Sequence, residues 1–190
     1  MREPINIETD DNKLIDAFIE GNENAFNYIV LKYQKKVYRI IRRIVLNHDD
    51  TNDILQEVFI KLYNSMSEYR RESRLFTYLY RIAVNHSLNH IRKAKKNKAC
   101  IVQINDDIHD LSSTNPGIEE ELEKKEKIKI VEKALKSLPE KQRLVFILRF
   151  YDNLSYEEIG EILNISKGGL KANYFHAVKK IQKIITDERQ

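Results

Sequence analysis

The sequence leaves few positions at which a helix would be forced to end. Only five glycines and three prolines occur in 190 residues, and leucine, isoleucine, lysine, glutamate and tyrosine recur between them at helical spacing. Glycine and proline are the residues least compatible with a helix interior, so their scarcity favours helices over other elements. Hydrophobic residues make up 42% of the chain, as expected of a folded protein. We therefore predict an all-α fold.

The helical pattern is interrupted over one long stretch near the middle of the chain. From residue 98 to residue 118, basic residues give way to acids and then to the turn-forming sequence SSTNPG. We interpret residues 98–118 as a flexible linker between two small helical domains, residues 10–97 and residues 119–187. The second domain contains a helix-turn-helix.

Two local patterns add detail to these domains. Proline is favoured at the first position of a helix, so Pro139 is expected there in the second domain. In the first domain, one face of the opening helix is expected to lie in the core: Leu14, Ile15, Phe18 and Ile19.

Residues 154–185 predict two helices separated by a tight turn. Ser155 and Glu158 have the spacing of a capping box, in which each side chain bonds the backbone N–H of the other residue. Asn164 tolerates the left-handed conformation that often ends a helix, and Ser166 can cap the next helix two residues later. The second helix turns a basic and polar face outward: Lys167, Lys171, Asn173, Phe175 and His176. This is the pattern of a DNA-reading helix-turn-helix, and equally that of a core helix with a solvated lysine face.

Glycine occurs inside both predicted helices of this helix-turn-helix. Gly160 and Gly169 each cost about 1 kcal/mol relative to alanine inside a helix. Their presence indicates that a close approach of helices or backbone matters more here than helix propensity.

A second basic surface is predicted in the first domain. Residues 67–98 hold nine basic residues and two acids, and one helical stripe there is polar throughout: Tyr78, Arg81, Asn85, Asn89, Arg92 and Lys96. Such side chains bond bases and phosphates, and an exposed tyrosine can stack on an unpaired base. Phe76 and Tyr80 are expected in the core instead, and Tyr78 is the better candidate for contact. Ordinary surface charge is the alternative for either basic surface alone.

A different stripe is predicted on the preceding helix, opposite its core face. It comprises Asp53, Gln56, Glu57 and Ile60. Because a purely solvated face would rarely include an isoleucine, this stripe favours contact with a protein partner.

Several classes of function are disfavoured by what the sequence lacks. It has no apolar run long enough to span a membrane and no signal-peptide core, so we expect a cytoplasmic protein. Cys100 is the only cysteine, and His86 and His90 lack a third ligand at metalloprotease spacing, so neither a metal nor any other cofactor is predicted. Convergent carboxylates with a nucleophile are also lacking, so we predict no catalytic residues and no enzyme.

Three ordered motifs together resemble the sigma factors of bacterial RNA polymerase, of the extracytoplasmic-function (ECF) type. They are DILQEVFIKLY (residues 53–63), SRLFTYLYRIAVNHSLNHIRK (residues 73–93) and LPEKQRLVFILRFYDNLSYEEIGEILNISKGGLK (residues 138–171). The first domain resembles sigma region two, which binds core polymerase and recognises and melts the minus-ten promoter element. The second resembles sigma region four, which reads the minus-thirty-five element.

The resemblance implies a role for each face. Binding of core polymerase falls to Asp53, Gln56, Glu57 and Ile60. Contact with the minus-ten element falls to Arg74, Tyr78, Arg81, Asn85, His86, Asn89, Arg92, Lys93 and Lys96. Contact with the minus-thirty-five element falls to Ser166, Lys167, Lys171, Ala172, Asn173, Phe175, His176 and Lys179. Ala172, Asn173 and His176 stand where the family often has a hydroxyl and arginines, which leaves fewer groups for base readout.

The implied partners are core RNA polymerase, through its largest and second-largest subunits, and promoter DNA, with an anti-sigma factor as a further candidate. The expected function is promoter-directed transcription initiation without chemistry of its own. The alternative is a stand-alone helix-turn-helix transcriptional regulator, which would leave the Asp53 to Tyr63 motif and the second basic stripe unexplained.

Overall fold

The computed structural model describes residues 5–98 and 130–187, and the described residues fall into two units. Unit 1 comprises residues 5–98 and unit 2 comprises residues 130–187. The regular elements of both described units are helices, which confirms the all-α fold and its two helical domains. None of the described helices is both long enough and apolar enough to cross a membrane. The predicted linker, residues 98–118, lies almost wholly outside the described residues.

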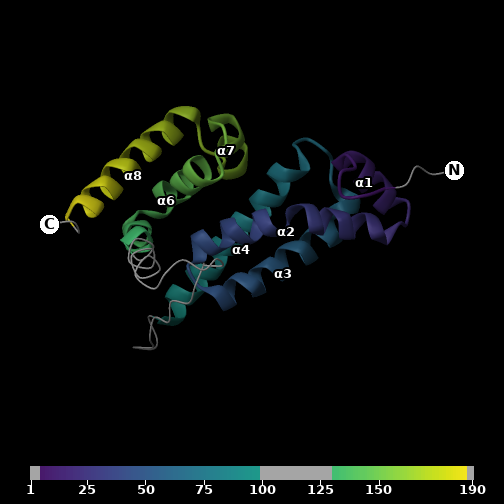
Figure 1. Cartoon of the computed structure of the whole chain (residues 1–190), viewed down its shortest axis with the longest axis horizontal. Coiled ribbons are helices and arrows are strands. Elements are labelled where there is room, and N and C mark those ends of the chain that lie inside the picture. The colour runs from purple at the N-terminus through teal and green to yellow at the C-terminus, as the bar shows by residue number, and fades with distance from the viewer. Residues whose placement is uncertain (1–4, 99–129, 188–190) are drawn as a thin grey trace, which may run out of the picture. The chain divides into compact units, whose positions relative to one another are not determined.

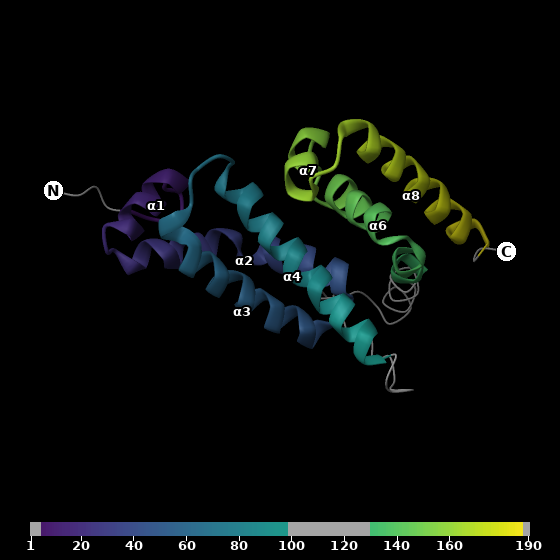
Figure 2. The same cartoon turned by 180° about the vertical axis from the view of Figure 1, so that it is seen from behind.

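Unit 1 is a bundle of three long helices with a short helix at one end (Figure 1). Its elements are α1 (Asp11–Ile19), α2 (Glu23–Val45), α3 (His48–Ser65), the 3₁₀ turn η1 (Met66–Glu68) and α4 (Leu75–Lys98). Helices α2, α3 and α4 each contact the other two, and α1 packs on α2, as the reverse view also shows (Figure 2). The apolar stripes of the three long helices therefore meet in one core.

Polar side chains cap α1 and attach it to α2. The Asp10 carboxylate accepts from the backbone N–H of Asn12 at 2.9 Å and caps α1. The Tyr33 hydroxyl of α2 donates to Asp11 at 2.5 Å, and the Lys32 ammonium donates to the other oxygen of Asp11 at 2.6 Å. Burial and the bond to Asp11 raise the pKa of Tyr33 well above its usual value, so the phenol stays protonated as the donor. These bonds anchor α1 to α2.

One core prediction for α1 is wrong. Leu14 and Ile15 are fully buried, but Ile19 is 52% exposed. Ile19 is the last residue of α1, and the chain then turns through Gly21, whose φ of +94° only glycine adopts readily, into α2. A residue at the end of a short helix can thus have the helical spacing of a core position without being covered.

Unit 2 is smaller and is built around the longest of its helices. Residues 130–137 are helical and are followed by α6 (Glu140–Phe146), the π-helical turn η2 (Ile147–Tyr151), α7 (Tyr156–Leu163) and α8 (Lys167–Asp187). Both α6 and α7 pack on α8 (Figure 1). Val145, Ile159, Leu170 and Ala177 are fully buried where these helices meet.

The local signals read from residues 154–185 are confirmed. Ser155 accepts from the Glu158 backbone N–H at 3.1 Å, and the Glu158 carboxylate accepts from the Ser155 N–H at 2.8 Å, which completes the capping box. Asn164 is left-handed, with φ 53° and ψ 50°. Since α7 ends at Leu163 and α8 begins at Lys167, the turn has the three-residue length of a helix-turn-helix.

Gly160 and Gly169 allow the close approach predicted from the sequence. In both cases the neighbouring residue is Ile165. A Cβ atom on Gly160 would lie 3.3 Å from the Ile165 carbonyl oxygen. One on Gly169 would lie 3.1 Å from Cγ2 of the same isoleucine. The turn between α7 and α8 is therefore packed against both helices.

The entry to α6 differs from the prediction by one position. Pro139 is the N-cap residue and not the first helical residue, and its carbonyl accepts from the Arg143 N–H at 2.9 Å. The helix then widens into η2, a π-helical turn that the sequence pattern did not predict.

We predict that Ser155→Ala lowers the free energy of unfolding of unit 2 by about 1 kcal/mol, because the Glu158 N–H loses its partner at the start of α7. Hydrogen exchange of the α7 and α8 amides in the full chain measures this loss. Ser155→Asp is the matched control, since it keeps an acceptor at the cap and should change exchange much less. Equal exchange in Ser155→Ala and the wild type would contradict the prediction.

Candidate nucleic-acid and protein interfaces

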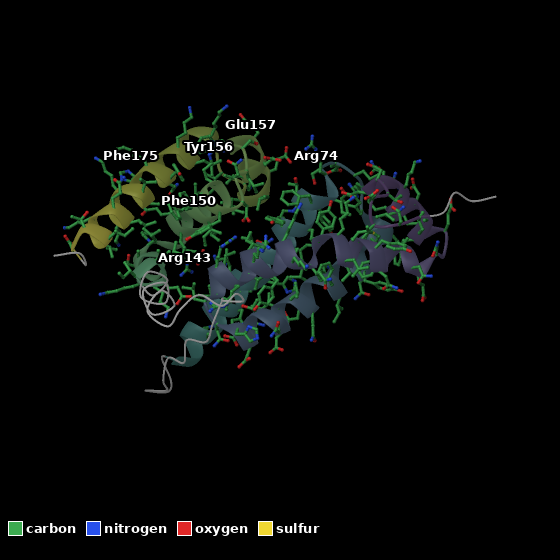
Figure 3. All side chains as sticks on the ribbon, in the orientation of Figure 1. Arg74, Arg143, Phe150, Tyr156, Glu157 and Phe175 are labelled. Carbon is green, nitrogen blue, oxygen red and sulfur yellow. The ribbon has the colours of Figure 1, made fainter. Side chains whose placement is uncertain are left out.

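The basic stripe of α4 lies opposite the buried face of that helix. Leu79 and Ala83 are fully buried, and Val84 is 1% exposed. Arg74, just before α4, is exposed, and its carbonyl accepts the first helical bond, from the Tyr78 N–H at 3.1 Å (Figure 3). The other exposed members of the predicted stripe are Arg81, Asn85, Asn89, Arg92, Lys93 and Lys96. Unit 1 thus presents a long cationic and amide-bearing helix face, suited to phosphates and base edges.

The two histidines of α4 are paired with acids of α3. His86 Nδ1 lies 3.1 Å from Glu57 Oε2, and His90 Nε2 lies 3.1 Å from Asp50 Oδ2. His86 is half-buried and marks the edge of the basic stripe. The structure therefore links a residue predicted to contact DNA with one predicted to contact polymerase.

A polar pocket of about 250 Å³ lies beside the start of α4. The rings of Tyr69 and Tyr78 form part of its wall, with centroids 5.0 Å apart and an angle of 32° between the ring planes. The Arg81 guanidinium lies 5.5 Å from the centre of the Tyr78 ring, and the Tyr78 hydroxyl donates to Ser65 at 3.0 Å. Burial is the main cause of a raised pKa of Tyr69.

Charged groups of both signs complete the lining of this pocket. Its cations are Lys61, Arg70 and Arg81, and its carboxylates belong to Glu68 and Glu72. Aromatic faces with cations around them can hold a stacked base and its phosphate. The sequence pointed to Tyr78 but not to Lys61 or Ser65, because these lie on α3 and reach the pocket only through the packing of α3 on α4.

The other aromatic side chains of α4 behave differently from Tyr78. Tyr80 is 2% exposed, as expected of a core residue. Phe76 is half-buried, and its ring centroid lies 4.1 Å from that of Tyr80.

The α3 stripe predicted to meet a protein is exposed. Asp53, Gln56 and Glu57 are all accessible, and Ile60 is 60% exposed. Tyr63, one turn further, is 43% exposed, and its ring packs edge-on against Phe18 and Phe26. Tyr63 is not part of the predicted stripe, although its three-residue spacing from Ile60 places both on one face of the helix.

The outward face of α8 combines cations with an exposed aromatic ring. Phe175 is 55% exposed (Figure 3), and the Lys179 ammonium lies 4.6 Å from the centre of its ring. Lys171, Ala172 and His176 are also exposed. A face of this composition fits the major groove, where lysine meets phosphates or guanine and an apolar group meets the thymine methyl.

Three other predicted contacts of this unit are already engaged in the free protein. The Lys167 ammonium donates to Glu157 of α7, and this bond lowers the pKa of the Glu157 carboxyl. The Asn173 amide nitrogen donates to the Gly169 carbonyl at 2.7 Å, and the Ser166 hydroxyl accepts from the Gly169 N–H at 3.3 Å. If α8 reads bases, as the sequence predicts, it does so mainly through its other exposed side chains.

Comparison with known families assigns a match to each unit. Residues 29–97 match the family model described as Sigma-70 region 2, and residues 128–181 match the one described as Sigma-70, region 4. The first match covers most of unit 1 but not α1. The second includes α6, α7 and most of α8.

Whole-chain relatives agree with these matches. The chain is 33% identical over 179 residues to the ECF RNA polymerase sigma-E factor of Escherichia coli, covering 90% of this chain and 92% of that protein. It is 30% identical over 185 residues to the RNA polymerase sigma-H factor of Pseudomonas aeruginosa, covering 92% and 93% respectively. The solved complex of the sigma factor RpoE with the anti-sigma factor NepR from Bartonella quintana shares the fold, with a TM-score of 0.68, 21% identity and coverage of 85% and 96%.

We predict that Glu157→Gln raises the affinity of the full chain for duplex DNA about two- to fivefold at low salt. The substitution removes a negative charge beside Lys167 and leaves that lysine available to a phosphate. A titration of labelled duplex DNA at several salt concentrations measures the change. Glu161→Gln, which makes the same charge change on α7, is the control, and an equal rise in that variant would attribute the effect to net charge alone.

Proposed function

Because the chain belongs to the ECF family of RNA polymerase sigma factors, which direct core polymerase to promoters for transcription initiation, we propose that its two units divide promoter contact between them. Unit 1 binds core polymerase and the minus-ten element, and unit 2 binds the minus-thirty-five element. The chain contributes binding and no chemistry of its own. The observation that carries this division is the presence of a separate exposed cationic face on each folded unit.

Core polymerase docks on the exposed stripe of α3. Ile60 of this stripe supplies exposed apolar area. The surrounding acids, Asp53 and Glu57, supply negative charge that attracts a basic partner. Tyr63 extends the apolar part of this surface. Centrally placed apolar side chains tend to carry most of the energy of such an interface, so Ile60 is its anchor.

The minus-ten element meets the α4 stripe and the pocket beside it. The exposed cations of α4, Arg81 and Arg92 among them, contact phosphates of the DNA backbone. An unpaired base enters the pocket and stacks against Tyr78, which Ser65 and Arg81 hold in place. Stacking on an open strand favours the melted promoter over the duplex.

The minus-thirty-five element lies against α8 in the major groove. Lys171, Phe175 and His176 face the bases, and Lys179 contacts phosphate. An anti-sigma factor is a further partner, by analogy with the Bartonella quintana complex, and would cover one of these exposed faces.

A direct test combines the purified chain with core polymerase. The sigma function requires that the chain bind core and support transcripts that start at defined promoter positions. A chain that ignored core but bound duplex DNA tightly would instead be a stand-alone helix-turn-helix regulator.

We predict that Ile60→Asp weakens binding of core polymerase at least tenfold, because loss of the apolar anchor costs about 2 kcal/mol and the interface would also have to desolvate a carboxylate. Titration of labelled protein with core measures the affinity. Lys171→Glu is the reciprocal control, since it should bind core like the wild type. If Ile60→Asp bound core polymerase like the wild type, the proposal that α3 forms the interface would be wrong.

We predict that Lys171→Glu abolishes recognition of the upstream element, since a base contact is worth about 1–3 kcal/mol and the reversed charge repels phosphate. Holoenzyme that carries Lys171→Glu should transcribe promoters with and without the minus-thirty-five element equally. The wild-type holoenzyme should favour the promoters that have it. Equal loss of core binding and upstream recognition would contradict the proposed division between the units.

A further inference from the structure

The pocket beside α4 depends on a segment that has little regular structure of its own. Five of its lining residues come from residues 68–73, a run that begins at the last residue of η1 and ends just before α4. Within this run Arg71 is the residue that does not line the pocket. The loop must nevertheless be held in one conformation for Tyr69 to stay against Tyr78.

Arg71 adopts a backbone conformation that arginine rarely takes. Its φ is +57°, in the left-handed region that favours glycine and asparagine. Such a residue persists only when its surroundings fix it. The feature that holds Arg71 therefore also shapes the pocket wall on either side of it.

Two side-chain hydrogen bonds help to hold this loop. The Arg71 guanidinium donates to the Asp16 carboxylate of α1, which raises the pKa of Arg71. Across the loop, the Tyr69 hydroxyl donates to the Ser73 carbonyl. The first contact ties the loop to a different helix, and the second only closes it on itself.

Helix α1 is a firm support for such a tie. It is fixed to α2 by the bonds from Lys32 and Tyr33 to Asp11, and it also contacts η1, from which the loop departs. This helix lies before residue 29, where the match to Sigma-70 region 2 begins. Support for the pocket thus comes from outside the matched segment.

We propose that α1 positions the pocket loop through the pair formed by Asp16 and Arg71, which makes both residues positioning residues for binding of the open minus-ten strand. Neither residue lines the pocket or touches the strand. The inference rests on the proposed function of the pocket. Because the Arg71 and Asp16 side chains are 39% and 55% exposed, the pair is worth a modest change in affinity and not its complete loss.

The test is a charge exchange in the full chain assembled with core polymerase. The probe is a promoter fork, taken from a start site mapped after overproduction, in which the non-template minus-ten strand is unpaired and carries 2-aminopurine. Asp16→Arg and Arg71→Asp should each weaken binding of the fork about three- to fivefold. The double exchange restores the pair with reversed polarity and should recover affinity to within about twofold of the wild type.

Controls separate this effect from backbone strain and from net charge. Aspartate tolerates the left-handed region better than arginine, so a loss in Arg71→Asp is not caused by strain at that position. Glu8→Arg makes the same charge change as Asp16→Arg at another exposed acid of the N-terminal segment and should bind the fork like the wild type. Core binding and helical circular dichroism should be unchanged in all these variants.

Two results overturn the inference and spare the proposed function. One is wild-type fork binding by both single exchanges while Tyr78→Ala weakens it. The other is a double exchange no better than either single one, which would mean that the two residues act separately. If Tyr78→Ala also binds like the wild type, the pocket does not hold the strand, and the proposed function fails together with the inference.

Discussion

The burial of one face of α4 against α2 and α3 is the interaction on which the rest of unit 1 depends. Leu79, Ala83 and Val84 are removed from water there, and each apolar side chain so buried favours a single rotation of the helix about its axis. A rotation that turned the opposite face inward would bury the charged Arg81 in an apolar core, at a cost of several kcal/mol. The cationic stripe is therefore exposed because the opposite face is apolar. The same rotation presents Tyr78 to the pocket.

In unit 2 the corresponding constraint is the angle between α7 and α8. Two neighbouring features set this angle. One is the left-handed Asn164, and the other is the lack of a side chain at Gly160, where a Cβ atom would lie 3.3 Å from the Ile165 carbonyl oxygen. A side chain at Gly160 would push the turn away from α7, and the face of α8 that carries Lys171 would move with it. Lys171 lies on the exposed face of α8 and outside this packing, whereas Lys167 bonds Glu157 of α7. At Lys171, charge and framework are thus separate properties, and a substitution there can alter one without the other.

Sequence predicted best the features whose causes are local. The capping box at Ser155 and the helix end at Asn164 depend on residues within one turn of each other, and helical periodicity was enough to predict the exposure of Ile60 and Arg81. The pairing of His86 with Glu57 depends on how α3 meets α4, which no local pattern encodes. The left-handed conformation of Arg71 has the same kind of cause, and so does the exposure of Ile19 at the end of α1. The roles proposed for these faces stay predictions.

The composition of the two cationic faces suggests why a sigma factor would bind promoters as a subunit of polymerase and not alone. Exposed lysines and arginines are screened at physiological salt, and each contributes little alone. Around α8 the groups that could contact bases are reduced further, because the Ser166 and Asn173 side chains already bond the backbone of Gly169. Two weak DNA contacts on one chain bind more tightly together when a partner protein holds them at the correct spacing. Once the first contact has formed, the second forms within the same complex and at a high effective concentration. Polymerase bound to α3 would supply that spacing, which makes promoter affinity a property of the assembled complex and not of either face.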